Sequence, residues 1–148
     1  MYKYAHIGIY ADVYDNLFGI PCGDSKKYGI AYLHNVLTLK APYSVAELEK
    51  FILSVFGKCY FEQHREEDVS ALETHLKIKG YANASRGLRF VFISRTPNEG
   101  YRFVPADRAE SGYYTHIEKE AVNIKLEYND GALAEAFKRV LLYSKSPE

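Results

Sequence analysis

The stretch GLRFVFISRTPNEGYRFVP, residues 87–105, contains two runs of aromatic and β-branched residues separated by a short break. In the first run, every second residue is large and apolar, which predicts a β-strand, and the second run has the same character. The break, Thr-Pro-Asn-Glu-Gly at 96–100, combines residues that tight turns favour. It holds no nucleophile paired with a base. We therefore interpret it as the turn of a hairpin and not as a catalytic loop.

Further strands are predicted on both sides of this hairpin. We expect them at 3–10, 29–40, 112–118 and 121–128, with glycine-containing loops at 16–28 and 80–87. The segment 121–128 alternates most clearly, because Val122, Ile124 and Leu126 are separated by polar residues.

Three helices are predicted. Ser44 and Glu47 form a capping box before an apolar stripe at helical spacing, and Gly57 is a plausible stop. A second helix is expected at about 67–77. The last helix should be capped by Asn129 or Asp130. This order of elements predicts an α+β fold, a largely antiparallel sheet packed with about three helices, in a single domain spanning 1–148.

The composition narrows the possible functions. The chain has 148 residues, with 19 basic and 19 acidic residues and a formal net charge of zero, so it has no overall basic field for nucleic acid. We expect a cytoplasmic protein, since the N-terminus lacks a signal-like apolar core and no apolar run approaches the roughly 18 residues of a membrane span. The 14 tyrosines suit a protein interface as well as base stacking.

Metal, cofactor and thiol chemistry is not indicated by any motif. The five histidines form no HExxH or similar ligand pattern, and no phosphate-binding glycine motif is present. Cys22 and Cys59 lie far apart in the sequence and form no CxxC, so neither a disulfide framework nor a zinc site is predicted. A nucleophilic pair of Cys59 and His64 is conceivable, but a small buried cysteine is the simpler interpretation. We expect no cofactor and no metal.

Two functional alternatives remain open from the residues. Arginines interleave with the aromatic residues of the hairpin, a combination that could stack bases, although the same arginines could simply pair with acids. A small enzyme acting on a nucleotide or nucleic acid could instead use these arginines with a histidine such as His116. The arginines in question are Arg86, Arg89, Arg95 and Arg102.

The C-terminal part of the chain, residues 88–145, resembles immunity proteins of bacterial contact-dependent growth inhibition (CDI) systems. The match lies in the order of a strand ending in Phe103-Val104-Pro105, a strand with Val122-Asn123-Ile124, and a final helix reached through Asn129-Asp130. The resemblance implies a protein that is not an enzyme. It implies a one-to-one complex with the C-terminal toxin domain of the cognate effector, often a nuclease, whose active site or substrate surface is blocked. No membrane and no direct nucleic-acid contact are implied.

Five residues are candidates for contact with such a toxin. Glu66, Glu67 and Asp68 form an acidic segment that could favour a helix N-terminus, attract a basic partner, or do both. Tyr113 and Tyr114 are aromatic anchors. Because they are adjacent on an expected strand, they should point to opposite faces, and one of them should be exposed. Since the chain is neutral overall, we expect an interface of tyrosines and local acids.

Overall fold

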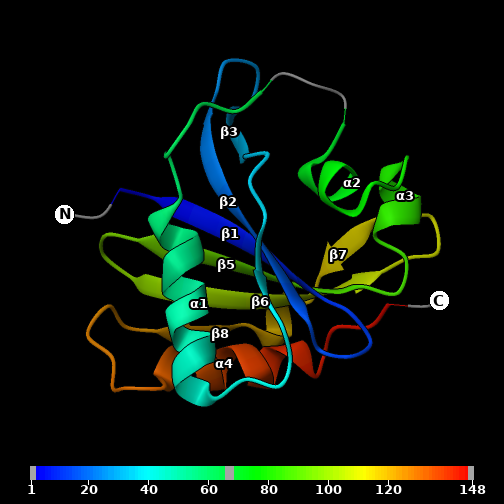
Figure 1. The fold of residues 1–148 in the computed structure, drawn as a ribbon. Helices are drawn as coiled ribbons and strands as arrows, with labels where there is room; N and C mark the ends of the chain where they lie inside the picture. The colour runs from blue at the N-terminus through cyan, green and yellow to red at the C-terminus, as the bar shows by residue number, and fades with distance from the viewer. Residues whose placement is uncertain (1–2, 66–68, 147–148) are drawn as a thin grey trace.

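The computed structural model describes residues 3–65 and 69–146, which form an α+β domain built on one antiparallel sheet (Figure 1). The eight strands follow the order β3-β2-β1-β5-β6-β7, with β4 added beside β2 and β8 beside β6. The strands are β1 (Ala5–Ala11), β2 (Leu17–Ser25), β3 (Gly29–Tyr32), β4 (Leu37–Leu39), β5 (Arg89–Thr96), β6 (Gly100–Arg108), β7 (Tyr114–His116) and β8 (Val122–Ile124). The helices are α1 (Val45–Gly57), α2 (Ala71–Leu76), α3 (Tyr81–Ala84) and α4 (Ala132–Leu141), with the 3-10 turn η1 (Glu118–Glu120). The predicted fold class is confirmed.

The predicted hairpin is β5 and β6, and its turn has a strict requirement at one glycine. Phe92 pairs with Val104, and Thr96 pairs with Gly100 at the closed end. Gly100 has a φ of 89°, and a Cβ there would lie 2.4 Å from the carbonyl oxygen of Ile124. Only glycine meets both conditions without strain. The 96–100 segment therefore makes a turn, as predicted.

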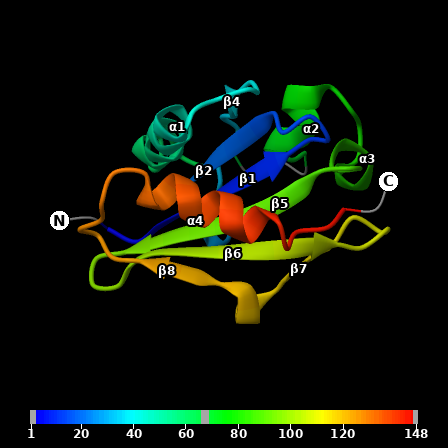
Figure 2. The same ribbon diagram turned by 90° about the horizontal axis from the view of Figure 1, so that it is seen from below.

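The two faces of the sheet carry different layers. Ile7, Ile9, Ile93 and Phe103 are buried against α1 and α4 in the larger core. The next residues along the same strands face the other way, and Tyr10 joins a second core with α2 and α3. Figure 2 shows α4 running alongside β5 and β6, in agreement with the contacts between these elements. The sheet is thus sandwiched between a two-helix layer and a smaller, incomplete layer.

The predicted loop at 16–28 is wrong, because most of this segment is the long strand β2. Its glycines mark close packing. A Cβ at Gly19 would lie 2.6 Å from the Val55 side chain. Pro21 has no amide proton to donate, and none is needed at its position. Its carbonyl accepts from Leu33 N at 2.9 Å, so the Pro21 nitrogen points to the same edge of β2, between the residues that pair with β4 and those that pair with β3.

Several element boundaries also differ from the predictions. The expected strand at 29–40 is divided into β3 and β4. Of the strand expected at 121–128, only three residues form a strand, β8. The expected loop at 80–87 contains the short helix α3. Within the described residues, the second helix starts later than predicted, because Ser70 and Glu73 form a capping box of their own.

The helix α1 agrees with the prediction, whereas the cap of α4 does not. Ser44 and Glu47 make both hydrogen bonds of the predicted capping box. In α4, neither Asn129 nor Asp130 is the N-cap. Gly131 occupies that position with a φ of 88° and offers no side chain.

A carboxylate from α1 takes over the capping of α4. The two oxygens of Glu49 accept hydrogen bonds from Gly131 N at 2.7 Å and from Leu133 N at 2.9 Å. This satisfies amides that have no partner inside the helix, and it places a negative charge at the positive end of the helix dipole. A tertiary contact of this kind could not be predicted from the sequence near residue 130.

Glu49→Ala should lower the free energy of unfolding by about 1–2 kcal/mol, because two charge-assisted hydrogen bonds to the start of α4 are lost. Urea unfolding measured by circular dichroism tests this. Lys50→Ala is the matched control, since Lys50 is an exposed neighbour on the same helix. Equal stability of the two variants would contradict the capping role.

Candidate interaction surfaces

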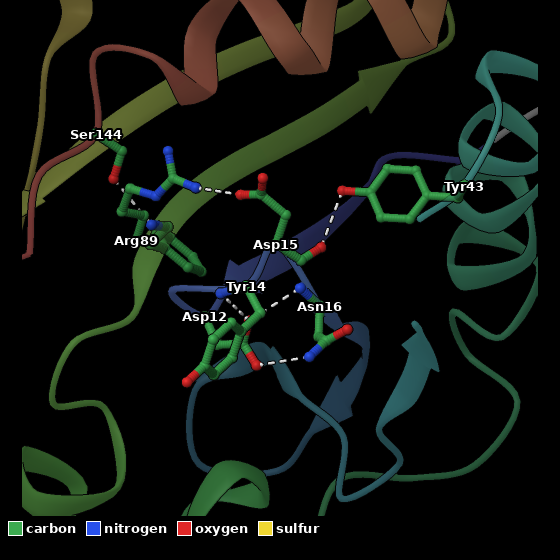
Figure 3. Close-up of polar contacts among 8 residues, drawn as sticks. Asp12, Tyr14, Asp15, Asn16, Tyr43, Arg89 and Ser144 are labelled. Carbon is green, nitrogen blue, oxygen red and sulfur yellow. Dashed lines mark hydrogen bonds and ion pairs between the residues drawn. The ribbon is translucent and has the colours of Figure 1, made fainter. Parts of the chain in front are cut away.

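The turn between β1 and β2 carries two exposed apolar side chains, of which Figure 3 shows Tyr14. Val13 is 63% exposed and Tyr14 is 77% exposed. The Asp12 carboxylate accepts hydrogen bonds from Tyr14 N at 2.8 Å, Asn16 N at 2.9 Å and Asn16 Nδ2 at 3.0 Å. This Asx-type network fixes the turn without using the exposed side chains.

Contacts from two other segments hold this turn in place. Arg89 of β5 donates to Asp15 Oδ1 at 2.6 Å, and Tyr43 Oη donates to the carbonyl oxygen of Asp15 at 3.0 Å (Figure 3). A hollow of about 380 Å³ lies between the turn and the C-terminal end of α4, where Leu142 is also exposed. We call this region the turn surface. Its sequence signal was the Asp-Val-Tyr-Asp-Asn run at 12–16, which the sequence analysis did not single out.

The C-terminal segment is fixed to the sheet by a buried serine. Ser144 Oγ donates to the Ala106 carbonyl at 2.5 Å and accepts from Phe90 N at 2.9 Å. The Lys145 carbonyl accepts from Arg108 N at 2.8 Å. Residues 144 and 145 therefore bind β5 and β6, and the exposed Leu142 and Tyr143 are held in a defined position.

Tyr113 and Tyr114 differ in exposure, as the sequence analysis expected. Tyr113 is 77% exposed. Tyr114 is half-buried, and its hydroxyl donates to the Leu88 carbonyl at 2.6 Å. Burial raises the pKa of Tyr114, so it remains a neutral hydrogen-bond donor. Of the two, only Tyr113 is free to insert into a partner.

A hollow of about 440 Å³ adjoins these two tyrosines. It is lined by Tyr81, Ala82, Ser111, Gly112, Tyr113 and Tyr114. A Cβ on Gly112, whose φ is 98°, would lie 2.9 Å from Ala82, so this glycine allows the 109–113 loop to approach α3. The hollow therefore lies where the sheet meets α3 of the smaller helical layer. We call this region, with α2 and α3, the tyrosine surface.

The wall of the tyrosine surface is supported by a buried arginine. Arg108 is only 4% exposed. Its guanidinium donates to Ala82 O at 2.6 Å, Ser85 Oγ at 3.1 Å and Ala109 O at 3.2 Å. These bonds tie α3 to β6, and they satisfy a buried cation with uncharged acceptors. The geometry of the hollow thus depends on Arg108.

The acidic candidates Glu66, Glu67 and Asp68 lie outside the described residues. In the chain they are followed by Val69 and by Ser70, the N-cap of α2.

A row of rings crosses the face of the sheet that carries Tyr10, next to the tyrosine surface. The ring centroid of His6 lies 5.1 Å from that of Tyr32 and 5.3 Å from that of Phe92, which in turn lies 5.1 Å from His116. Burial of the His6 imidazole lowers its pKa to about 4. His6 is therefore neutral at physiological pH and acts as an aromatic packing residue.

Three of the four arginines considered for nucleic-acid or nucleotide chemistry are engaged with acids or rings, and the fourth, Arg86, is exposed. Arg89 pairs with Asp15 at 2.6 Å, and Arg102 pairs with Glu118 at 2.6 Å. The guanidinium of Arg95 lies 4.8 Å from the Phe56 ring centroid. His116 Nδ1 lies 3.8 Å from the same Glu118 carboxylate. Pairing with acids was the simpler of the two interpretations considered for these arginines.

Two searches of the described residues gave negative results. In residues 3–65 and 69–146, no three acidic, cysteine or histidine side chains are grouped as a metal site would require. Over the same ranges, none of the helices combines the length and apolar character needed to cross a bilayer.

Comparison with known proteins gives similarity of fold without similarity of sequence. No protein-family model matches the chain, and no curated protein sequence matches it significantly. A protein of unknown function from Neisseria meningitidis superposes with a TM-score of 0.72 at 12% identity, over 96% of both chains. A chain of a CdiA-CT/CdiI toxin and immunity complex from Yersinia pseudotuberculosis superposes with a TM-score of 0.69 at 8% identity, over 97% of this chain and 99% of that one.

The low pKa of His6 predicts a loss of stability on acidification. The unfolded chain protonates this imidazole below about pH 6.5, whereas the folded protein does so only near pH 4. The unfolded state therefore binds more protons in this window, and the free energy of unfolding should fall by about 3 kcal/mol between pH 6.5 and 4. His6→Phe should reduce this dependence and His116→Gln should not. If the free energy of unfolding of His6→Phe depended on pH as strongly as that of the unaltered protein, the low pKa assigned to His6 would be contradicted.

Proposed function

We propose that this protein is a CDI immunity protein, which binds the C-terminal toxin domain of its cognate effector in a one-to-one complex. Binding neutralises the toxin by covering its active site or its substrate surface. The protein acts in the cytoplasm of the cell that makes it, and it needs no cofactor for this role.

The observation that carries the proposal is the extent of the fold similarity. The likeness to a chain of the Yersinia toxin and immunity complex covers 97% of this protein and 99% of that chain. The segment 88–145, whose order of elements resembles immunity proteins, forms the β5–β6 hairpin, β7, β8 and α4. Two independent likenesses, one of sequence pattern and one of fold, therefore support the same biological system.

The arrangement of charged groups favours an inhibitor over the toxic enzyme of such a pair. The arginines that an enzyme would need, Arg89 and Arg102, each have a carboxylate within 2.6 Å. Tyr81 and Tyr114, next to the hollow of the tyrosine surface, have pKa values raised mainly by burial, so both hydroxyls stay protonated near neutral pH and are poor proton donors. These groups suit recognition of a partner by contact and not proton transfer.

The tyrosine surface is the proposed site of toxin contact. It combines an exposed aromatic anchor, Tyr113, with an adjoining hollow, which is the geometry of interface hot spots. The acidic segment Glu66, Glu67 and Asp68, which comes shortly before α2 in the sequence, would speed the capture of a basic toxin. Tyr114 lines the hollow, and the exposed Tyr113 makes the direct contact with the toxin.

Co-expression with the toxin domain encoded next to this gene tests the function. We expect cells to survive and the two proteins to co-purify, because a tight complex keeps the toxin covered. A toxin inactivated by substitution in its active site is the control, because its complex with this protein can be measured in cells that do not depend on neutralisation for survival. Cell death with no complex would contradict the proposal for this pairing, and turnover of RNA or nucleotide by the isolated protein would favour the enzyme alternative.

Tyr113→Ala should weaken toxin binding about 10- to 100-fold, because an exposed aromatic anchor is removed from a desolvated contact. Tyr14→Ala is the matched control, since both tyrosines are 77% exposed and Tyr14 lies on the turn surface. Isothermal titration calorimetry measures both. A larger loss for Tyr14→Ala would move the interface to the turn surface.

A further inference from the structure

The fold brings the two cysteines of the chain together, which the sequence analysis did not predict. Cys22 lies on β2 and is fully buried. Cys59 is half-buried and follows α1, which ends at Gly57. Both are free thiols.

The two sulfur atoms lie at the backbone of the same residue. His6 N donates to Cys22 Sγ at 3.4 Å, and the Cys59 thiol contacts the His6 carbonyl oxygen at 3.7 Å. The two main chains are also adjacent, because Tyr60 N donates to the Cys22 carbonyl at 2.8 Å. Neighbouring backbones of this kind are what a disulfide between two chain segments requires.

The two thiols also interact with each other. A hydrogen bond from the Cys59 side chain is the main cause that lowers the pKa of Cys22 to about 7, and the His6 backbone amide adds to the effect. A sulfur that ionises near neutral pH is a competent nucleophile. The pKa of the half-buried Cys59 thiol is raised by its hydrogen bond with Cys22 and by burial, so Cys22 is the nucleophile of the pair and Cys59 is its more exposed neighbour.

We infer that Cys22 and Cys59 form a reversible redox site, in which a hydroperoxide converts the two thiols to an intramolecular disulfide and a thiol reductant restores them. This inference concerns the isolated protein and does not depend on the proposed function.

The reaction balances in two steps. The sulfur of Cys22 attacks the O–O bond of a hydroperoxide that enters past Cys59, becomes a sulfenic acid and releases water or an alcohol. The sulfur of Cys59 then attacks the sulfenic sulfur, forms the S–S bond and displaces hydroxide, which takes up the Cys59 thiol proton to leave as water. The protein loses two electrons in total, and the hydroperoxide gains them.

The disulfide would link the end of α1 to the middle of β2. The enclosed chain contains β3, β4 and all of α1, so the crosslink removes much of the freedom of this part of the unfolded state. Oxidation should therefore stabilise the larger core on one side of the sheet, and leave the tyrosine surface on the other side unchanged.

Hydrogen peroxide added to the native protein tests the inference. The count of free thiols, measured after unfolding, should fall from two to none, and the mass should fall by about 2 Da. The melting temperature should rise by about 5–15 °C. Treatment with a phosphine reductant should return the thiols, the mass and the melting temperature to their starting values.

Cys59→Ser is the matched control, because it keeps a small polar side chain at a half-buried position. Its melting temperature should not rise with peroxide, and Cys22→Ser should behave in the same way. Three results would each overturn the inference. They are two free thiols after peroxide treatment of the native protein, a gain of oxygen mass in place of a loss of hydrogen, and a disulfide that leaves the melting temperature unchanged.

Discussion

The pairing of β1 in the middle of the sheet is the constraint on which the rest of the structure depends. This strand hydrogen-bonds to β2 on one side and to β5 on the other, so both of its edges are satisfied. Its alternation sends Ile7 and Ile9 into the larger core and leaves His6 and Tyr10 on the opposite face. Gly8 lies between them, where a Cβ would come within 2.6 Å of the Phe90 ring. The aromatic packing on the second face requires this missing side chain.

The two faces of the sheet have different roles because their helical layers differ in size. On one face, α1 and α4 bury a continuous apolar core and are joined by Glu49 at the start of α4. On the other face, α2 and α3 are short, and they are held partly by polar contacts from Arg108 and from the Tyr10–Tyr81 hydroxyl pair at 2.6 Å. Stability therefore resides mainly in the first layer. The second layer has room for the exposed tyrosine and the hollow that we propose for toxin contact.

The sequence predicted those parts of the fold whose stabilisation is local. The hairpin at 88–105, the capping box of α1 and the apolar stripe of α4 depend on neighbouring residues, and all three were recognised. The strand β2 was missed because Gly19 and Pro21 carry the composition of a loop. Their positions make sense only once α1 and the β3 and β4 pairings are present. The cap of α4 and the meeting of Cys22 with Cys59 were missed for the same reason, since both join residues distant in the sequence.

The candidate contact residues were likewise only partly predictable from the sequence. Because Tyr113 and Tyr114 are adjacent, the sequence could predict that one of them is exposed, but it could not predict that this is Tyr113, which lies just before β7 in the 109–113 loop. The hollow beside it could not be expected, because it is formed by α3 and a loop that approach each other through Gly112.

The most direct test of the central claim is a titration of the purified, active toxin domain with this protein, with the toxin's own catalytic activity as the readout. The account predicts that the activity falls linearly and reaches zero at one equivalent, because a tight one-to-one complex covers the catalytic or substrate surface. Full activity in the presence of a large excess would contradict it.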